Sequence, residues 1–570
     1  TGSGTLTAQG TGSDDTYGVA AGGYVTLAGR ATLNPTALDD LVLEGFDGND
    51  TFDVATGHGY TDVTLSGGGP AGSDTANLTG DGTAITIDLD LQQVSGGGLG
   101  TVSLAGVEDV DLDADGGDVM VTGTVGDDAL TVSPSGSDAA ELDVAGLNTA
   151  FSLDGLDALT LNPGSGDGDT VTVLGNASAN GITVDRTTAT VTVMGLQAVT
   201  VNAGNTEALI VDGGLNDDTV TVRNSGGPAL TVLGSGPAAS DTLVVETATA
   251  DATVTPGTSV DSGSVSVSGG QTTQFEGVEY VTIDGGGAVM TLSVLGTDAD
   301  NAIAVSPSVT GDATVSVDNR ALVTLRNISS GAVVDIDAGA GDDTIEVQPV
   351  SGVDVEAGGG GPAGSDEVIV EGTSSGDTIV YTPDGTDVRA GTVSLGVTTT
   401  SFTGMESVTI DGLGDSDAFT ANGTSADNST VVTPDGGSGG QFQVDSYSPV
   451  SFASMETVTF DGQGGTNAVT VEGTTNNDTM AIDAGAASVT LNGQTLGLVA
   501  GNTSSLVANL GDGDDNVTVT PDSSIAVEVN GGDPSSSSDD LTVDTGGDDT
   551  TVTETTVSVS GSADVDYSGF

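Results

Sequence analysis

Apolar and polar residues alternate along this chain in short runs of about five residues. Typical runs are TVTV at 219–222 and TIEV at 344–347, in which every second residue is apolar. Because successive side chains of a strand point to opposite faces, each run predicts a strand with one buried face. Glycine-rich and aspartate-rich turns separate the runs, and leucine and lysine in helical heptads are missing. The pattern therefore predicts an all-β protein built from short strands.

Two markers recur along the chain and define its repeats. The first is G-T-x-x-x-[D/N] followed by a strand, as in GTVGDDALTV from Gly123 and GTSSGDTIVY from Gly372. The second is a glutamate-containing run, as in GMESVTID from Gly404. Copies of the first marker lie about 50 or about 75 residues apart, which we interpret as two or three units of about 25 residues. The longer blocks carry an extra segment of the type GGGPAGSDT, which begins at Gly67.

A unit of about 25 residues with two or three strands has the size of one coil of a β-helix. We therefore expect one continuous parallel β-helix, or β-solenoid, over residues 1–570, with roughly 23 right-handed coils. The alternative is a string of small antiparallel β-sandwiches, although blocks of about 50 residues are small for independent sandwiches without disulfides. The approximate block starts are residues 10, 80, 123, 175, 246, 296, 372, 423, 473 and 545.

Charge and cysteine content narrow the possible partners. The chain has 83 Asp and Glu, 6 arginines and no lysine, for a formal net charge of −77. Nucleic acid and anionic membrane surfaces are excluded as partners, because both need clustered basic side chains. No run is long and apolar enough to predict membrane insertion. Cysteine is absent, so disulfides and thiolate metal sites are excluded; the start at Thr1 fits a mature secreted chain or a fragment of a longer one.

Turns that combine glycine and aspartate precede several strands, as in GAGDDTIEV from Gly339 and GDGDDNVTV from Gly511. They resemble the haemolysin-type (repeats-in-toxin) calcium motif G-G-x-G-x-D-x-U-x, where U is apolar. Gly339, Gly341, Asp343 and Ile345 match four of its five fixed positions, and the copy at Gly511 matches the same four.

The resemblance implies a secreted bacterial surface or adhesin-type protein that binds calcium between consecutive coils, at Asp343 and Asp515. The family repeats its motif in tandem, whereas these copies stand alone. A stacked coil would have to supply the second set of oxygen ligands. A calcium ion takes six to eight oxygens from carboxylates and backbone carbonyls.

A denser acidic cluster runs from Glu108 to Asp118. It begins like an EF-hand loop, but Thr122 replaces the glutamate expected at the twelfth position and no helices flank it. We expect calcium at this loop and at the glycine–aspartate turns; the alternative is that these aspartates cap turns or form a solvated acidic face. The candidate metal ligands are Asp47, Asp50, Asp111, Asp113, Asp115, Asp118, Asp217, Asp218, Asp337, Asp342, Asp343, Asp512, Asp514 and Asp515.

We do not expect an enzyme, because the single histidine, His58, lies in a polar loop and the arginines are scattered. The strand-like segments 1–10 and 550–561 favour stacking of copies end to end or laterally. The expected function is that of an extracellular structural protein, a self-assembling subunit of a surface filament or surface layer stabilised by calcium or other divalent cations. The first alternative is a non-polymerising adhesin or carbohydrate-binding stalk with glycans as partners. The least favoured is a β-helix polysaccharide-degrading enzyme. The acidity is also typical of adaptation to high salt, which needs no specific sites.

Overall fold

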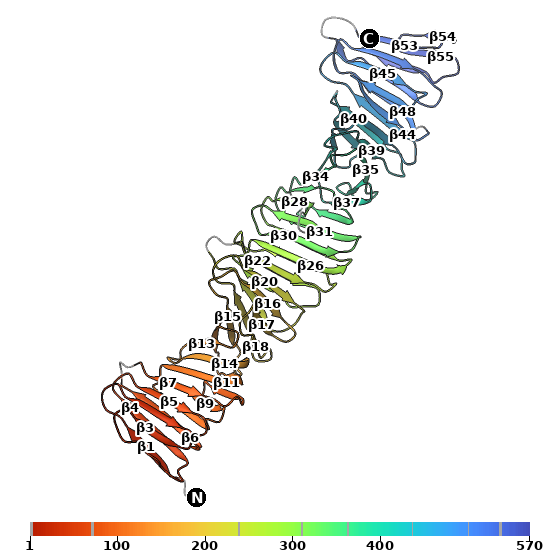
Figure 1. Cartoon of the computed structure of the whole chain (residues 1–570). Coiled ribbons are helices and arrows are strands. Elements are labelled where there is room, and N and C mark those ends of the chain that lie inside the picture. Colours follow the sequence, from red (N-terminus) through yellow and green to blue (C-terminus); the bar gives the residue numbers. More distant parts are fainter. Residues whose placement is uncertain are drawn as a thin grey trace. The chain divides into compact units, whose positions relative to one another are not determined.

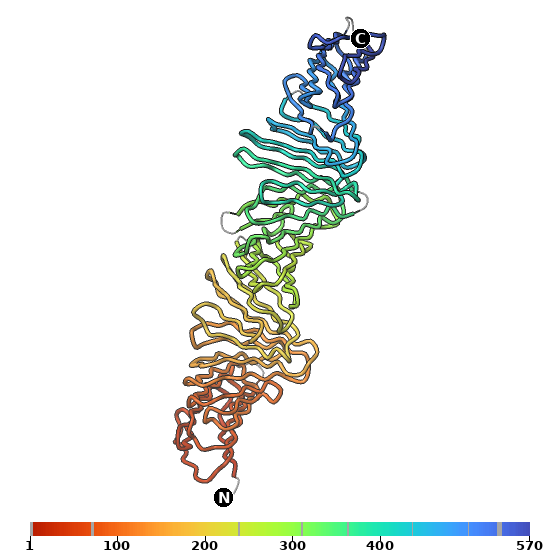
Figure 2. The backbone as a smooth tube through the Cα atoms, turned by 90° about the vertical axis from the view of Figure 1, so that its right-hand side faces the viewer, coloured from red at the N-terminus to blue at the C-terminus, as the bar shows by residue number. Residues whose placement is uncertain are grey.

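The computed structural model describes residues 4–69, 73–236, 240–308, 312–361, 364–435, 437–499, 501–534 and 539–570. The chain divides into two compact units, Thr1–Ala252 with Gly257–Asp284 and Thr253–Pro256 with Gly285–Phe570. Within each unit the described residues form strands and turns and no helix (Figure 1). The predicted parallel β-solenoid is confirmed, but it has about 14 turns and not the roughly 23 that were expected. Figure 2 shows how the backbone of each unit winds coil upon coil.

Strands one coil apart pair in parallel and in register, and so form stacks. In the first unit, one stack contains β1 (Thr5–Gln9), β4 (Asp40–Phe46), β6 (Asp62–Gly68) and β10 (Thr101–Ala105), and a second contains β2 (Thr16–Ala20), β5 (Thr51–Ala55), β7 (Thr75–Thr79), β11 (Asp109–Thr122) and β14 (Ala150–Asn162). A third contains β8 (Ile85–Asp88), the second halves of β11 and β14, and β18 (Val199–Val201). A fourth contains β12 (Ala129–Pro134), β15 (Thr170–Leu174), β19 (Ala208–Asp212), β21 (Ala229–Leu233) and β25 (Thr273–Glu276), and a fifth contains β16 (Gly181–Asp185), β20 (Thr219–Arg223), β22 (Thr242–Glu246) and β26 (Tyr280–Ala288).

The second unit repeats this arrangement. One stack contains β27 (Thr291–Thr297), β31 (Ala332–Gly339), β33 (Val353–Gly358) and β37 (Thr398–Thr403), and a second contains β28 (Ala302–Pro307), β32 (Thr344–Val347), β34 (Glu367–Glu371), β38 (Ser407–Asp411) and β42 (Val450–Ala453). A third contains β35 (Thr378–Pro383), β39 (Ala418–Asn422), β43 (Thr457–Asp461) and β47 (Gln494–Leu498). A fourth contains β40 (Ser429–Pro434), β44 (Asn467–Glu472), β48 (Thr503–Asn509), β51 (Ala526–Asn530) and β56 (Val565–Ser568), and a fifth contains β45 (Thr479–Asp483), β50 (Asn516–Thr520) and β53 (Asp540–Val543).

Antiparallel connector strands pair with strands of the stacks, and several of them join the first strand of one stack to the last strand of another. For example, β13 (Ala140–Val144) pairs antiparallel with both β12 and β14, and β36 (Gly391–Leu395) does the same with β35 and β37. The others are β3 (Tyr24–Leu27), β9 (Gln93–Gly96), β17 (Thr190–Val193), β24 (Gly263–Val267), β29 (Ala313–Val317), β41 (Gly440–Val444), β46 (Ser488–Leu491) and β55 (Thr556–Val559). Five further strands are β23 (Ala252–Pro256), β30 (Leu322–Ile328), β54 (Thr550–Val552) and the short β49 (Asp512–Gly513) and β52 (Asp533–Pro534), which pair with each other.

The coil length differs from the expected 25 residues. Equivalent turn residues in consecutive coils are 41 residues apart at Asp128 and Asp169, but 24 apart at Asp50 and Asp74. The predicted length of about 25 residues is therefore wrong for the long coils and right for the short ones. Each short coil ends at the aspartate of an extra segment, as at Asp74. The middle parts of these extra segments lie outside the described residues.

The hydrophobic interior consists of the inward-facing residues of every stack. Val, Leu and Ile alternate with exposed or half-buried Thr, Ser and Asp along each strand, and nearly all of the inward side chains are less than about 4% exposed. In the second unit Phe419, Phe442, Phe452 and Phe460 pack together with ring centroids 5.4 to 6.3 Å apart. Burying one such side chain stabilises the fold by about 1.5–3 kcal/mol, so each stack is held chiefly by this interior.

Candidate functional site: buried carboxyl columns and acidic sheet faces

Each coil carries an acidic or amide residue at the point where one of its stacked strands begins. The side chains of these residues stack from coil to coil into what we call carboxyl columns. Within a column, each residue after the first accepts a hydrogen bond from the backbone N–H of the equivalent residue one coil earlier, through Oδ1 of an aspartate or asparagine or through Oε2 of a glutamate. Asp343 accepts from Asn301 at 2.7 Å, and Asp366 accepts from Asp343 at 2.9 Å. The columns are Asp15–Asp50–Asp74–Glu108, Asp128–Asp169–Glu207, Asn180–Asp218–Asp241–Glu279, Asn301–Asp343–Asp366–Glu406, Asp377–Asp417–Glu456, Asn428–Asn467 and Asp478–Asp515–Asp539.

The two sequence markers are the two ends of these columns. The G-T-x-x-x-[D/N] marker begins a column: Asp377 accepts a hydrogen bond from the backbone N–H of Thr373 in its own turn at 2.6 Å. A glutamate ends five of the seven columns, as where Oε2 of Glu456 accepts a hydrogen bond from the backbone N–H of Asp417 at 2.7 Å, whereas the other two columns end at Asn467 and Asp539. The repeats visible in the sequence therefore mark where a column starts and stops.

The glycine that recurs five residues before the column residue has a steric reason. Gly123 stands five residues before Asp128, and a Cβ added to it would lie 2.0 Å from the carbonyl oxygen of Pro163 in the next coil and 2.7 Å from Oδ2 of Asp128. Gly412 stands in the same relation to Asp417 and to the carbonyl of Ser454. Glycine is favoured here because a Cβ at this position would overlap these two oxygens.

The inner members of the columns keep one carboxylate oxygen buried without a hydrogen-bond partner among the described residues. Asp50, Asp343 and Asp515 are at most 2% exposed. The partnerless oxygens are Oδ2 of Asp50, Asp169, Asp218, Asp241, Asp343, Asp366, Asp417, Asp515 and Asp539. Burial without a partner disfavours the charged form of a carboxyl group.

Burial accordingly raises the pKa of several column carboxyls. It is the largest cause at Asp50, Asp343 and Asp515, where neighbouring carboxylates add to it and the hydrogen bond from the preceding coil opposes it. The same direction and leading cause hold for Asp74, Asp218 and Asp366. Burial raises the pKa of Asp241 to about 6.

Four of the candidate metal ligands, Asp50, Asp218, Asp343 and Asp515, are column residues. The residues that precede them, Asn49, Asp217, Asp342 and Asp514, occupy an outer column at the solvent-facing side of the turns. There Asp342 donates its backbone N–H to Asp300 at 2.9 Å and accepts from Ser365 at 3.0 Å. Asp217 accepts from the next coil in the same way, at Ser240, and the backbone N–H of Asp514 donates to Asn477. In the outer column the later coil thus supplies the backbone N–H and the earlier coil supplies the side-chain oxygen, which is the reverse of the inner column.

The other candidates lie apart from the columns. Asp47 is exposed in a turn beside Gly69, and Asp512 is exposed in β49. Asp337 is exposed at the end of β31, where Asp335 and Glu356 line a groove of about 490 Å³ with it.

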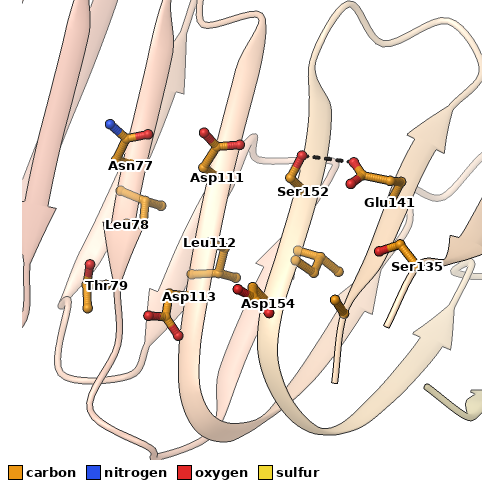
Figure 3. A pocket seen from close by; sticks show the side chains of 12 residues that line it. Asn77, Leu78, Thr79, Asp111, Leu112, Asp113, Ser135, Glu141, Ser152 and Asp154 are labelled. Carbon is orange, nitrogen blue, oxygen red and sulfur yellow. Dashed lines mark hydrogen bonds between the residues drawn. The ribbon is translucent and has the colours of Figure 1, made fainter. Parts of the chain in front are cut away.

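The cluster from Asp111 to Asp118 is a bent strand. Asp111 and Asp113 project from one face of β11, and the strand bends at Asp115, which has φ of 52° and whose N–H donates to Asp113 at 3.0 Å. Asp118 is exposed beyond the bend. Figure 3 shows Asp111 and Asp113 side by side on β11 with Asp154 on the neighbouring strand.

These side chains line an open acidic groove of about 440 Å³ on the sheet face. Glu141 of β13 closes one side of it and accepts a hydrogen bond from Ser152 at 2.8 Å (Figure 3). Asn77 of β7 lies at the opposite side. We call this surface the β11 groove.

Exposed carboxylates also face each other across neighbouring coils. Asp40 pairs in register with Asp62, so two like charges lie on adjacent strands spaced about 4.8 Å apart. Among the described residues the other such pairs are Asp113–Asp154, Glu246–Asp284, Asp335–Glu356, Glu371–Asp411 and Glu528–Asp566. Like charges directly opposite each other destabilise a sheet, so a cation would relieve repulsion at such a pair. At Glu246 the guanidinium of Arg223 already forms an ion pair at 3.0 Å.

In the part of the chain that the structure describes, no three Asp, Glu or His side chains lie close enough together to hold a metal ion. In the columns, one oxygen of Asp343 accepts a backbone hydrogen bond and the other is buried, so calcium there would need the turn to open. Pairs of exposed carboxylates with backbone carbonyls or water provide oxygen chemistry suited to calcium. Calcium at the listed aspartates stays a prediction.

Two buried polar side chains were not identified from the sequence as structural. His58 is 3% exposed: Nδ1 accepts from the backbone N–H of Tyr60 and Nε2 donates to the carbonyl of Leu99, both at 3.0 Å. Arg186 is 4% exposed and donates to the carbonyls of Gly226 and Pro228. Their residue types alone carry no signal of burial, because the strands that cover them come from other coils.

No protein-family model matches the sequence, and comparison with curated proteins found no match. Among the described residues, the structure contains no helix with the length and apolar character needed to span a membrane.

Proposed function

We propose that this protein is an extracellular structural protein, a β-solenoid subunit of a surface filament or surface layer whose coils are stabilised by divalent cations. The observation that carries the proposal is the in-register stacking of acidic side chains from coil to coil. The chain uses carboxyl groups inside its turns as hydrogen-bond acceptors between coils, and it lines its sheet faces with carboxylate pairs such as Asp40–Asp62.

A scaffold role accounts for how the polar residues are used. Both sequence markers serve to start and stop columns, so the recurring chemistry of the chain is devoted to joining coils. The same side chains are spread over many coils of both units, as expected for a protein whose property of interest is its own extended repetitive structure.

A cation requirement follows from the charge. The carboxylates that give the chain its formal net charge of −77 repel one another, and this repulsion opposes the packing of adjacent coils. Divalent cations would bridge carboxylates on neighbouring coils or on neighbouring molecules, which links the stability of one chain to assembly of several.

Electron microscopy of the full chain at rising concentration, with calcium and with chelator, tests assembly. We expect ordered filaments or sheets with calcium. Isolated particles at every concentration, with or without calcium, would contradict the assembly proposal.

Thermal unfolding at fixed ionic strength tests the cations separately. Removal of divalent ions, with monovalent salt added to match ionic strength, is expected to lower the midpoint, and metal analysis is expected to find bound calcium. An unchanged midpoint and no bound metal would leave high-salt adaptation as the explanation of the acidity.

A non-polymerising stalk that binds glycans is the second candidate. The β11 groove favours it, because Asn77, Ser152 and the carboxylates around them offer hydrogen-bond partners for sugar hydroxyls. Binding to a glycan array that is lost in the Asp113→Ala variant, together with absence of filaments, is the expected outcome for this candidate.

A further inference from the structure

The chain contains nine Asn-x-Ser/Thr tripeptides, or sequons, which have the acceptor sequence for N-linked sugars. They begin at Asn49, Asn77, Asn176, Asn327, Asn422, Asn428, Asn477, Asn502 and Asn516. Serine and threonine are frequent in this chain, so the tripeptide alone does not identify an acceptor. A glycosyl transferase must bind all three residues and reach the amide nitrogen of the asparagine, and burial and hydrogen bonding in the fold therefore distinguish one sequon from another.

In five sequons the asparagine or the hydroxyl residue is already used by the fold. In three of them the asparagine Nδ2 donates to a side chain of the coil before: Asn77 to Asp53, Asn422 to Thr382 and Asn502 to Asp461. Asn428 is a column residue and is 3% exposed. At the sequon of Asn327, the hydroxyl of Ser329 donates to the carbonyl of Gly287 at 2.7 Å.

In three more sequons the middle residue is buried. These residues are Asp50 after Asn49, Asp478 after Asn477 and Val517 after Asn516, and each is at most 2% exposed. A tripeptide whose middle side chain is anchored in the interior cannot enter the cleft of an enzyme unless the coil opens.

The sequon at Asn176 differs from the other eight, because all three of its residues are exposed. It lies in the turn between β15 and β16, and the next residue, Ala179, is exposed as well. Oδ1 of Asn176 accepts a hydrogen bond from the backbone N–H of Ser178 at 2.8 Å, which fixes the side chain in an Asx turn. Its Nδ2 has no hydrogen-bond partner among the described residues, and its neighbours Ala177 and Ala179 carry only methyl groups.

The backbone of this turn is held in place by side chains beneath it. Nδ2 of Asn180 donates to the carbonyl oxygens of Asn176, at 3.2 Å, and of Ser178. Nδ2 of Asn216, in the next coil, donates to the carbonyl oxygen of Ala177 at 2.8 Å. The solenoid therefore presents an ordered, exposed tripeptide whose amide nitrogen is available without any loss of contacts between coils.

We propose that Asn176 is a glycosylation site and carries an N-linked saccharide. The donor is a sugar joined through C1 to the diphosphate of a lipid or nucleotide carrier. Nδ2 of Asn176 forms a bond to C1 as the bond between C1 and the diphosphate oxygen breaks. The diphosphate leaves with the bonding electrons, and Nδ2 gives one proton to a base of the transferase. The proposal rests on the extracellular function proposed above, because N-linked sequons are used on chains that reach the outside of the cell.

Mass spectrometry of the full chain, isolated from the cells that make it, tests the proposal in the surface fraction and in the remaining cell material. The peptide that contains Asn176 is expected to carry sugar, located on that residue by fragmentation, and the peptides with Asn77 and Asn428 are expected to carry none. Absence of sugar from Asn176 in every fraction would overturn the inference. Sugar-bearing protein confined to the cell interior would instead contradict the proposed location and leave the site standing.

Two variants of Ser178, made in the same cells, separate the sequon from the fold. Ser178→Ala and Ser178→Thr both keep the backbone N–H that bonds to Asn176, so both are expected to fold as the wild type does. Ser178→Ala is expected to lose the sugar, whereas Ser178→Thr restores the sequon and is expected to retain it. Sugar on Asn176 in the Ser178→Ala variant at the wild-type level would show that the sequon does not direct the modification, and the assignment would fail.

Discussion

Glycine in the column turns is set by what lies above it in the next coil. Gly123 has no positive φ that would demand glycine, yet a Cβ there would overlap the carbonyl oxygen of Pro163. The first marker of the sequence therefore begins with glycine because two coils approach each other closely at that atom.

Gly123→Ala is expected to destabilise the protein by roughly 1–3 kcal/mol, because the added methyl group forces the two coils apart. Urea unfolding measures the loss. Gly385→Ala is the control, since nothing lies within 4 Å of a Cβ at Gly385, and it should leave the unfolding midpoint unchanged. Equal midpoints for both variants would show that the turn relaxes without cost.

His58 gives a second prediction at the residue scale, which concerns the change of stability with pH. Burial lowers the pKa of His58 from 6.5, and both ring nitrogens already serve the backbone of Tyr60 and Leu99. Protonation would place two N–H groups, those of Nδ1 and Tyr60, against each other. The folded chain resists this proton and the unfolded chain accepts it, so stability is lost as the pH falls below 6.5.

His58→Asn is expected to be less stable than the wild type at pH 7.5, with a difference that narrows by pH 5. Denaturant midpoints at the two pH values measure this narrowing. A constant difference would mean that His58 contributes packing alone.

At the scale of elements, the parallel stacks place like charges in register. Asp40 on β4 and Asp62 on β6 face each other across neighbouring strands. By contrast, Asp53 on β5 faces Asn77 on β7, whose Nδ2 donates to it at 2.6 Å.

Asp62→Asn is therefore expected to stabilise the protein by roughly 0.2–1 kcal/mol at low ionic strength, and the gain should disappear in high salt. Asp53→Asn is the comparison, and it should give no gain because it weakens a charge-assisted hydrogen bond. Melting curves at two salt concentrations check both. A gain of the same size in high salt would point to a cause other than charge.

At the scale of the whole molecule, the repeat of the sequence and the coil of the structure have different lengths. Successive markers at Asp377 and Asn428 are 51 residues apart in the sequence, whereas Asp377 and Asp417, one coil apart, are separated by 40. The column that starts at Asn428 therefore begins 11 residues (51 − 40), or about a quarter of a coil, further along than the column of Asp377. The expectation of 25-residue coils divided the spacing into equal units because nothing in the sequence distinguishes an antiparallel connector from a stacked strand.

The sequence by itself determined that the chain forms short strands, that these strands build a solenoid, and which residues make the turns. Alternation of apolar and polar residues, as at 219–222, is local chemistry that sets which face is buried. The aspartates of the turns were likewise visible, including Asp343 and Asp218.

Only the tertiary structure decided which of these aspartates are buried. Asp342 and Asp343 are adjacent in the sequence, yet the first is exposed in the outer column and the second is 1% exposed in the inner one. Their partners, Asp300 and Asn301, come from the coil before, 42 residues earlier. Burial and charge pairing depend on which coil lies against which, and that contact is made between residues too far apart in the chain for any local pattern to record it.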